Sequence, residues 1–513
     1  MDHNSVPKSK TQQTDAAAPS EQRISTGVSG LDDILGGGLP AGHLYLIEGD
    51  PGTGKTTLAL QFLLEGAARG ERGMYVTLSE SKAELEQVAA SHGWSLSDLT
   101  IFEMIPTDDD LNPEAQYTVF HPSEVELADT ITAITKQVNA VNPERVVFDS
   151  LSEFRMLARD PLKYRRQILA LKRHFTGRNC TLLLLDDRTA EGSAADQQLQ
   201  SIAHGVINLQ NRERDFGVTR RRVAVQKLRG SCYREGFHDY SILTGGLEIY
   251  PRLIAAEHKP GFVHKQVPSG LKELDDLFGG GIDTGTNTLL MGPAGSGKST
   301  IALRYAVSSA QRGEKAAIFT FDESLSTLIT RAKGLSMDPT PFLENGSLTI
   351  QQVDPAELSP GEFIARIRNL VESHRLRLVV IDSMNGFMNA MPTEQFLAMQ
   401  LHELFAYLGQ QGIASFVTLA QHGFAGAPVA PVDISYLADS VLLFRYFERH
   451  GSVRQSLSVV KKRSGRHERT IRELLFENGT IAVGPILTGF EGVLTGNPSF
   501  IGIDKEIYPE LGQ

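Results

Sequence analysis

Cysteine is almost absent from this 513-residue sequence, which holds only Cys180 and Cys232. Two thiols cannot form a disulfide framework or a four-thiolate zinc site. Long apolar runs are missing as well, since no stretch approaches the roughly 18 residues that a membrane span needs. Residues 1–22 are polar and lack the apolar region of a secretory signal, so they predict a disordered N-terminal tail. We therefore expect a cytoplasmic protein without a membrane partner.

Positive charge is also in short supply. The sequence has 50 lysine and arginine residues against 61 aspartate and glutamate residues, which gives a net charge of −11. Nucleic-acid-binding domains usually carry a basic surplus or stripe, so this balance predicts no nucleic-acid partner. The content of 41% hydrophobic and 22% charged residues is typical of globular proteins, and the length suits several domains.

What the sequence has instead is an internal repeat. Residues 23–81 match residues 266–324 without a gap, as in GLDDILGGG against ELDDLFGGG and GDPGTGKTT against GPAGSGKST. Such self-similarity marks two copies of one domain. We expect the first domain at residues 23–254, a linker with proline, glycine and charge at 255–267, the second domain at 268–500, and a short C-terminal tail at 501–513.

Each copy alternates strand-like and helix-like segments. Short continuous apolar runs (HLYLIE, GMYVTL, RVVFD and CTLLLL) are typical of strands covered on both faces. The segment TTLALQFLLEGAARG has the apolar spacing of a helix and ends in glycine. The second copy supplies NTLLM, AAIFTF, RLVVID and SFVTLA in the same order. We therefore expect an α/β protein in which each copy forms a mostly parallel twisted sheet flanked by helices and finishes in β-rich hairpins.

Two glycine-rich segments fit the phosphate-loop pattern, GDPGTGKT at 49–56 and GPAGSGKS at 292–299. Each stands between an apolar run and a helical segment, so its backbone N–H groups and the helix N-terminus suit the phosphates of ATP. The lysines are expected to reach the β- and γ-phosphates. The residues expected to bind the nucleotide are Gly49, Gly52, Thr53, Gly54, Lys55, Thr56, Thr57, Gly292, Gly295, Ser296, Gly297, Lys298, Ser299 and Thr300.

Mg²⁺ needs oxygen ligands beside such a loop. The hydroxyls of Thr56 and Ser299 follow the two lysines, and Asp149 and Asp382 end the apolar runs RVVFD and LVVID. These four residues are expected to hold Mg²⁺, with the aspartates acting directly or through water.

The attacking group also needs a base. Asp322 and Glu323 follow AAIFTF, whereas the first copy has Ser79 and Glu80 after GMYVTL. Carboxylates at a strand end beside the γ-phosphate suit a catalytic role. Alternatively, these residues begin a helix as its N-cap and first turn. On the catalytic interpretation, Glu80, Asp322 and Glu323 take part in the reaction.

Two basic motifs occupy corresponding places late in the copies, Lys227-Leu228-Arg229 and Lys461-Lys462-Arg463. Basic residues supplied in trans can neutralise transition-state charge during phosphoryl transfer. The alternative is a solvated edge strand protected by its charges. The candidate catalytic residues in these motifs are Lys227, Arg229, Lys461 and Arg463.

With these motifs, the chain resembles the KaiC family of double-domain ATPases and autokinases of the cyanobacterial circadian clock. The resemblance covers about residues 23–500 and also rests on KLRG at 227–230, DISYLADSVLLFRYFE at 433–448 and HERTIRELLF at 467–476. It implies two tandem RecA-like P-loop domains and a homohexamer with ATP at the subunit interfaces. It further implies a KaiB-like partner, and that the four basic residues act on the γ-phosphate of the neighbouring subunit.

By the same resemblance, the first domain is a slow ATPase and the second autophosphorylates adjacent hydroxyl residues. The acceptors fall on Ser435 and Tyr436, and Tyr436 departs from the serine or threonine of the family. Ser79 departs from the paired glutamates of the family, which predicts slow or absent hydrolysis in the first domain if the first acid of the pair is the base. Only thirteen residues follow LTGNPSF at 494–500, so we expect no KaiA-type activator.

We therefore expect an ATP-dependent hexameric ATPase and serine/threonine autokinase, and two other functions stay open. A RecA- or DnaB-like nucleic-acid-dependent ATPase would need basic loops, for which residues 212–214 and 220–222 are the candidates. A nucleotide-driven assembly switch would bind ATP and form a ring with little turnover.

Overall fold

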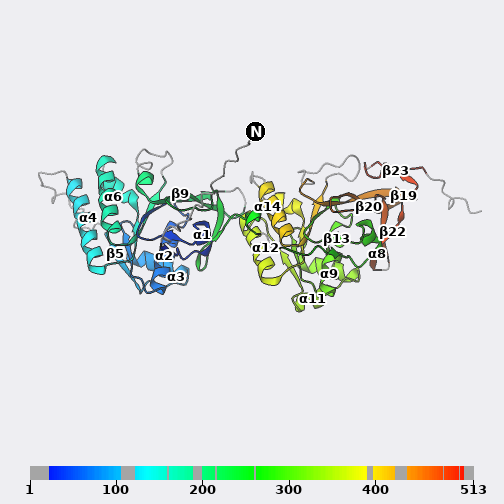
Figure 1. Cartoon of the computed structure of the whole chain (residues 1–513), viewed down its shortest axis with the longest axis horizontal. Coiled ribbons are helices and arrows are strands. Elements are labelled where there is room, and N and C mark those ends of the chain that lie inside the picture. Colours follow the sequence, from blue (N-terminus) through cyan, green and yellow to red (C-terminus); the bar gives the residue numbers. More distant parts are fainter. Residues whose placement is uncertain are drawn as a thin grey trace, which may run out of the picture. The chain divides into compact units, whose positions relative to one another are not determined.

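The structure of the protein is a computed structural model. It describes residues 22–104, 122–158, 161–188, 199–213, 217–258, 261–389, 397–421, 436–477, 479–495 and 497–501. These residues divide into two compact units. The first comprises the described residues up to Arg212 together with Arg221–Pro251, and the second comprises Glu213–Arg220 and the described residues from Arg252 onward. In Figure 1 the first unit runs from blue to green and the second from green to red.

In the described part of the first unit, nine strands form one sheet in the order β11-β10-β9-β8-β3-β7-β6-β4-β5. The strands from β8 to β5 in this order pair in parallel, whereas β9, β10 and β11 pair antiparallel. The strands are β3 (Leu44–Gly49), β4 (Gly73–Thr77), β5 (Leu99–Glu103), β6 (Arg145–Asp149), β7 (Thr181–Asp187), β8 (Gly205–Arg212), β9 (Arg220–Leu228), β10 (His238–Leu243) and β11 (Gly246–Tyr250).

Helices cover both faces of this sheet (Figure 1). The alternation of side chains along a strand fills both cores, because Val146 and Phe148 of β6 are buried in one apolar cluster and Val147 in the other. The helices are α1 (Ser29–Ile34), α2 (Lys55–Ala68), α3 (Lys82–Ser91), α4 (Pro122–Val141), α5 (Leu151–Ala158) and α6 (Pro161–Thr176).

The described part of the second unit repeats this plan with a nine-stranded sheet in the order β16-β15-β17-β18-β14-β19-β20-β21-β22. The strands are β14 (Asn287–Gly292), β15 (Ala316–Thr320), β16 (Leu348–Gln352), β17 (Leu378–Asp382), β18 (Ala414–Ala420), β19 (Ser440–Arg449), β20 (Ser452–Lys462), β21 (Arg472–Glu477) and β22 (Thr480–Ile486). Its helices are α8 (Lys272–Leu277), α9 (Lys298–Gln311), α10 (Leu325–Gly334), α11 (Thr340–Glu344), α12 (Pro360–His374), α13 (Met384–Asn389) and α14 (Leu397–Gln410).

The α/β class predicted from the apolar runs is confirmed: the chain consists of two tandem RecA-like domains, each with a mostly parallel sheet between helices. In each unit the parallel strands bring their carboxyl ends to one edge of the sheet, and the phosphate loop of that unit begins there. The first residue of segment 255–267 contacts α14 of the second unit: the backbone N–H of Ala255 donates to Oε2 of Glu403 at 2.9 Å. Within the described residues, none of the helices combines the length and the apolar character needed to span a bilayer.

Candidate functional site

Both phosphate loops adopt the same backbone geometry. Gly54 and Gly297 stand just before α2 and α9 with φ of +87° and +101°. A Cβ atom at Gly54 would lie 2.8 Å from Cδ1 of Ile242, and one at Gly297 would lie 2.7 Å from Cδ2 of Leu474. Glycine is therefore needed at both positions for its left-handed backbone and for the close approach of the C-terminal hairpin.

Each loop is held in shape by side chains that donate to its own carbonyls. The ammonium groups of Lys55 and Lys298 donate to the carbonyls of Gly49 and Gly292, both at 2.9 Å. The predicted nucleotide-binding residues Thr53 and Ser296 close the loops through their hydroxyls, which donate to the carbonyls of residues 50 and 293 at 2.7 and 2.8 Å.

A tyrosine from a distant strand completes each loop. Tyr240 of β10 donates to the carbonyl of Thr53 at 2.6 Å, and Tyr446 of β19 donates to the carbonyl of Ala294 at 2.9 Å. With these carbonyls engaged, the loop N–H groups and the helix N-terminus are arranged before any anion binds.

The two strand-end aspartates lie beside the loop hydroxyls, as the magnesium prediction requires. Thr56 donates from its hydroxyl to Oδ2 of Asp149 at 3.1 Å. Burial raises the pKa of both Asp149 and Asp382, and hydrogen bonds from Tyr75 and Thr56 to the first and from Thr418 and Ser299 to the second oppose that rise. One carboxylate next to one hydroxyl is the donor set that Mg²⁺ uses with phosphate and water, so the residues fit that ion.

The buried hydroxyl that supports each aspartate comes from a different strand in the two units. Tyr75 of β4 donates to Asp149 at 2.5 Å, whereas Thr418 of β18 donates to Asp382 at 2.5 Å. Both strands neighbour the strand that ends in the aspartate. The peptide bond after each aspartate is cis.

The predicted catalytic carboxylates do not cap the following helices. Ser81 caps α3 in a capping box with Glu84, and Ser324 caps α10 by accepting from the N–H of Thr327 at 3.2 Å. The N-cap alternative is therefore wrong for Glu80 and Glu323, which precede the caps and keep their carboxylates for other contacts.

Those contacts differ between the units. Oε2 of Glu80 is buried and has no hydrogen-bond partner among the described residues. Its burial raises the pKa of Glu80, and the charges of Asp149 and Glu84 raise it further. Glu323 instead accepts two hydrogen bonds from Arg331, and Asp322 accepts one from the hydroxyl of Ser383 at 2.5 Å.

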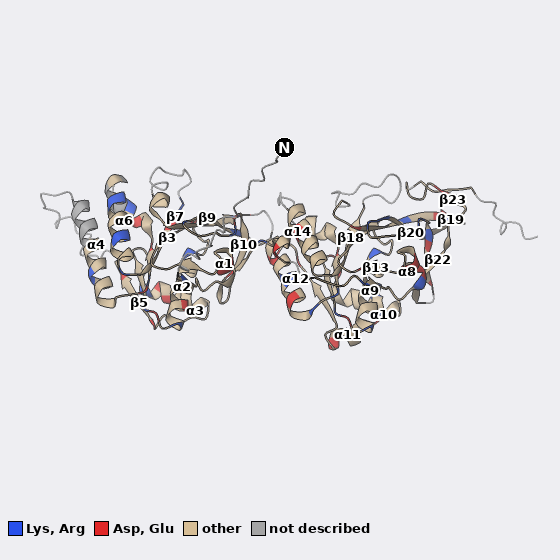
Figure 2. Ribbon diagram, viewed as in Figure 1, with Lys and Arg blue, Asp and Glu red and all other residues tan. Residues whose placement is uncertain are grey.

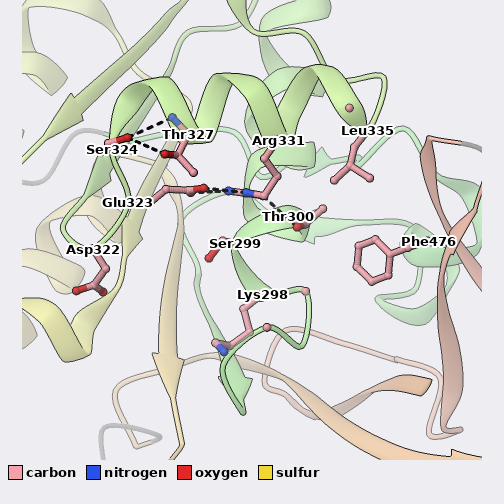
Figure 3. Close-up of a pocket in the computed structure, with 13 residues that line it drawn as sticks. Lys298, Ser299, Thr300, Asp322, Glu323, Ser324, Thr327, Arg331, Leu335 and Phe476 are labelled. Carbon is pink, nitrogen blue, oxygen red and sulfur yellow. Dashed lines mark hydrogen bonds and ion pairs between the residues drawn. The ribbon is translucent and has the colours of Figure 1, made fainter. Parts of the chain in front are cut away.

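In the second unit, Asp322, Glu323 and Arg331 line a pocket of about 760 Å³, which Figure 3 shows in close-up. Such a volume lies within the range of small-molecule sites. Lys298, Ser299 and Glu323 form its polar part, and Leu335 and Phe476 lie on the side away from Asp322 (Figure 3). An aromatic ring and an aliphatic side chain suit the flat face of a nucleobase.

In the first unit an acidic residue contacts the loop lysine. Asp187, the last residue of β7, pairs with Lys55 through Oδ1 and Nζ at 2.8 Å. Register places Asp187 opposite Gly49, and Ala420 opposite Gly292 in the second unit. The second repeat therefore has no carboxylate at the position equivalent to Asp187.

The basic motif of the first unit lies at the C-terminal end of β9. Lys227 on β9 donates to the carbonyls of Gln200 and Ala203 at 2.6 and 2.8 Å, and Arg229 donates to that of Ser201 at 2.8 Å. The edge-strand alternative stays open for both motifs, because β10 pairs with β9 only through residues 221–223 and β21 pairs with β20 only through residues 455–457.

A larger basic cluster surrounds this motif. Lys172 on α6 donates to the carbonyl of Ile202 at 2.6 Å, and burial together with Arg229 lowers its pKa. The pKa of Lys227 is lowered by burial, by Arg229 and by Lys172. Basic residues recur along α6 (Figure 2). Such a concentration of positive charge suits a polyanionic ligand.

In the second unit Arg463 lies beside the predicted acceptor segment. Its guanidinium donates to the carbonyl of Tyr436 at 3.0 Å and pairs with Asp439 at 3.3 Å. Tyr436 itself is 58% exposed. Lys461 lies on β20 opposite Val441 of β19. Ser435 lies outside the described residues.

In the part of the second unit that the structure describes, these residues lie outside the pocket around the phosphate loop. Tyr436, Lys461 and Arg463 are not among the residues that line the pocket around Lys298. The predicted catalytic residues of the second unit therefore form two separate groups. Asp322 and Glu323 lie at the pocket with the phosphate loop, and Lys461 and Arg463 lie outside it.

Of the basic residues considered for nucleic acid, Arg220 and Arg222 are buried in the protein, whereas Arg212 is exposed. Arg222 pairs with Asp239 at 3.3 Å within the sheet. Arg220, another of that group, is 4% exposed. Buried arginines of this kind are not available to a phosphate backbone.

Sequence reasoning missed several residues at these sites, namely Tyr75, Asp187, Arg331, Leu335, Thr418 and Phe476. Asp187 is the last residue of β7, so the strand-end rule that found Asp149 applied to it too, whereas Thr418 lies inside β18. Phe476 had no comparable signal, because its place at the pocket depends on tertiary packing. Arg331 lies only eight positions after Glu323, but no motif marked it.

Comparison with known proteins agrees with the duplicated fold. A family model described as the KaiC ATPase matches residues 24–254 and again residues 267–488. The circadian clock oscillator protein KaiC of Parathermosynechococcus lividus is 28% identical over 486 residues, covering 94% of this chain and 89% of the relative. That of a Picosynechococcus species is 27% identical over 502 residues, covering 97% and 96%. The circadian clock protein KaiC3 of a Synechocystis species is 26% identical over 488 residues, covering 93% and 95%.

Proposed function

The chain belongs to the KaiC family of ATPases, and from this premise we propose that it binds ATP with Mg²⁺ in both repeats and acts as an ATPase and a serine/threonine autokinase. Relatives in this family are named as circadian clock proteins. By that likeness, the activity serves a clock or a related signalling process in the cytoplasm, with a KaiB-like protein as partner.

The observation that carries the ATP proposal is the pocket around Lys298. It combines a preformed phosphate loop, a strand-end aspartate, two further carboxylates and an apolar wall with Phe476. The apolar wall suits the nucleobase of ATP, and the loop suits its phosphates. Ser299 and Asp382 suit the metal ion. A phosphate loop with a comparable aspartate recurs in the first unit.

In each unit the side chains divide the work of phosphoryl transfer. Lys55 or Lys298 holds the β- and γ-phosphates, and Thr56 with Asp149 or Ser299 with Asp382 holds Mg²⁺. When bound, Mg²⁺ neutralises charge on the phosphate oxygens. Glu80 accepts a proton from water in the first unit. In the second unit, Glu323, aided by Asp322, accepts a proton from water or from the hydroxyl that receives the phosphoryl group.

The separation of the two catalytic groups supports an oligomer. Arg463 and Tyr436 lie together but away from the pocket of their own unit. If Lys461 and Arg463 serve a γ-phosphate, that nucleotide belongs to another subunit, and the same logic applies to Lys227 and Arg229. A homohexameric ring with ATP at the interfaces meets this requirement for every subunit.

The same arrangement favours residues 435 and 436 as phosphoacceptors. Arg463 contacts the backbone of Tyr436, so a γ-phosphate that this arginine contacts comes close to the acceptor segment. Ser435 is the first candidate because its hydroxyl matches the chemistry of the family, and Tyr436 is the second.

We propose domain boundaries at residues 23–254 and 268–500, between the tail and linker segments given above.

The test uses the full chain with ATP, Mg²⁺ and a γ-phosphate label. Phosphate should appear on Ser435 and disappear in Lys298→Ala, while hydrolysis in the first unit persists and is lost in Lys55→Ala. Labelling that survives Ser435→Ala would assign the acceptor elsewhere, with Tyr436→Phe as the next variant. Size-exclusion chromatography with and without ATP shows whether the chain forms a hexamer when nucleotide is bound.

One observation favours a second candidate function for the first unit alone. The Lys55–Asp187 ion pair occupies the phosphate-binding lysine, which suits slow turnover and a nucleotide-driven assembly switch. ATP-dependent hexamer formation without phosphate release by the first unit would select this function.

A further inference from the structure

Arg331 is the one arginine that lines the pocket among the described residues. Its Nε and Nη2 donate to Oε1 and Oε2 of Glu323 at 3.0 and 2.7 Å, and its Nη1 donates to the hydroxyl of Thr300 at 3.1 Å. Figure 3 shows its guanidinium lying between the two partners. Arg331 thus links the predicted base to the helix that follows the phosphate loop.

The pair is only partly shielded from solvent, with 26% of the Arg331 side chain and 22% of the Glu323 side chain exposed. The exposed part faces the pocket, so a ligand there can reach the guanidinium. Arg331 also lowers the pKa of Asp382, whereas Glu323 raises it. Its charge therefore acts on the aspartate expected to hold the metal as well as on the expected base.

The first unit provides a natural contrast. The repeat places Val88 on α3 where the second unit has Arg331 on α10. Val88 packs against the apolar core, and Oε2 of Glu80 is left without a hydrogen-bond partner among the described residues. The arginine is therefore an addition to the second site and is not required by the fold of the repeat.

We propose that Arg331 is a phosphate-binding residue of the second unit, which exchanges the carboxylate of Glu323 for the phosphates of the incoming nucleotide. This inference rests on the proposed binding of ATP in that pocket. Without nucleotide the guanidinium holds Glu323, and with nucleotide it contacts phosphate oxygen and releases the carboxylate. The base of the second unit becomes available only after the substrate has bound.

Three physical features make the exchange favourable. A guanidinium presents the same planar set of donors to a carboxylate and to a phosphate. A bound triphosphate brings several negative charges into a pocket that Asp322 and Glu323 already line, so a cation gains more from the phosphates than from one carboxylate. Arg331 and Thr300 both line the pocket, so the guanidinium can turn towards a ligand while α10 stays in place.

The experiment measures ATP–Mg²⁺ affinity in the full chain with Lys55→Ala, so that the second unit supplies the binding. Arg331→Gln should weaken binding about tenfold or more, because it removes a charge-assisted contact. Glu323→Gln should tighten binding severalfold, because it removes the competing carboxylate. Lys333→Ala removes a positive charge from the same helix outside the pocket and should leave the affinity unchanged.

The opposite signs of the two effects identify the exchange. If the pair has a purely structural role, Arg331→Gln and Glu323→Gln would shift ATP affinity in the same direction or not at all, and either result overturns the proposal. Arg331→Lys keeps the charge but loses the paired donors, and its affinity should fall between those of the wild type and Arg331→Gln. If Arg331→Gln does not fold, the ATP affinity of Arg331→Lys tests the role of Arg331 instead.

The result also separates this inference from the proposed function. If the Lys55→Ala protein does not bind ATP, the function proposed for the second unit fails. If it binds ATP and loses binding in Lys298→Ala, but Arg331→Gln has no effect, the function stands and only the role of Arg331 is rejected.

Discussion

The hydroxyl of Tyr75 donates to Oδ2 of Asp149 at 2.5 Å, and the equivalent strand of the second repeat supplies no such hydroxyl. Position 318 there is an isoleucine on β15, and Thr418 reaches Asp382 from the strand on the other side. The two copies therefore both place a hydroxyl on the strand-end aspartate, but they supply it from different strands. Such a partner is needed because a buried carboxylate without donors costs free energy.

Replacing Thr418 by valine should lower the free energy of unfolding of the second unit. Valine keeps the shape but leaves Oδ1 of the buried Asp382 without this donor, which costs about 1–3 kcal/mol. Thr418→Ser keeps the hydroxyl and is the matched control. Denaturant unfolding of the full chain would report the difference, and equal stability of both variants would contradict the role given to the hydroxyl.

Asp187→Asn should strengthen ATP binding by the first unit. The substitution removes the ion pair that Lys55 must give up when it contacts phosphate. Asp187 is 43% exposed, so the pair contributes little and the expected gain is about two- to fivefold. Binding is measured with Lys298→Ala, so that only the first unit responds. Ala420→Asp places the acid in the second unit and should have the opposite effect there.

Glu80→Gln should reduce ATP hydrolysis by the first unit roughly 10²–10⁴-fold, which is the usual contribution of a general base. A base works only when ionised, and the pKa of Glu80 is raised by burial, by Asp149 and by Glu84. The rate should therefore fall, as pH is lowered, at a higher pH than an ordinary glutamate would give.

Glu84→Gln offers the control for that profile. It removes one of the charges that raise the pKa of Glu80, so the acid limb of the rate profile should move to lower pH. The measurement is the pH dependence of hydrolysis in Lys298→Ala protein. An acid limb that stays in place would show that Glu80 does not control the rate.

The sequence was sufficient for the parts of the site that are local in the chain. Each phosphate loop is one continuous segment, and Asp149 and Asp382 end recognisable strands, so their chemistry is visible in the motif and its repetition. Partners set by tertiary structure could not be found this way. Whether Tyr75 or Thr418 reaches an aspartate depends on the order of strands in the sheet, and Phe476 reaches the pocket around Lys298 from β21, far along the chain.

Mixing two inactive variants should restore autophosphorylation if the catalytic groups come from different subunits. Arg463→Ala keeps an intact pocket but lacks the trans-acting arginine, and Lys298→Ala has the arginine but lacks the loop lysine. In a mixed ring, the pocket of the first variant faces the intact edge of the second, and label should be transferred. Each variant alone is the control, and a mixture that stays inactive would argue for catalysis within one subunit.

The tyrosines that complete the phosphate loops also set an order of events during synthesis of the chain. Tyr240 and Thr53 are 187 positions apart, and Tyr446 and Ala294 are 152 apart. Neither loop can take its final shape until the strand that carries its tyrosine, β10 or β19, has left the ribosome. The described contacts that shape the first loop come from its own repeat, so the first unit can fold and take up nucleotide while the second is still being translated. Nucleotide bound at that stage stabilises the finished half of the chain against unfolding until the other half is complete.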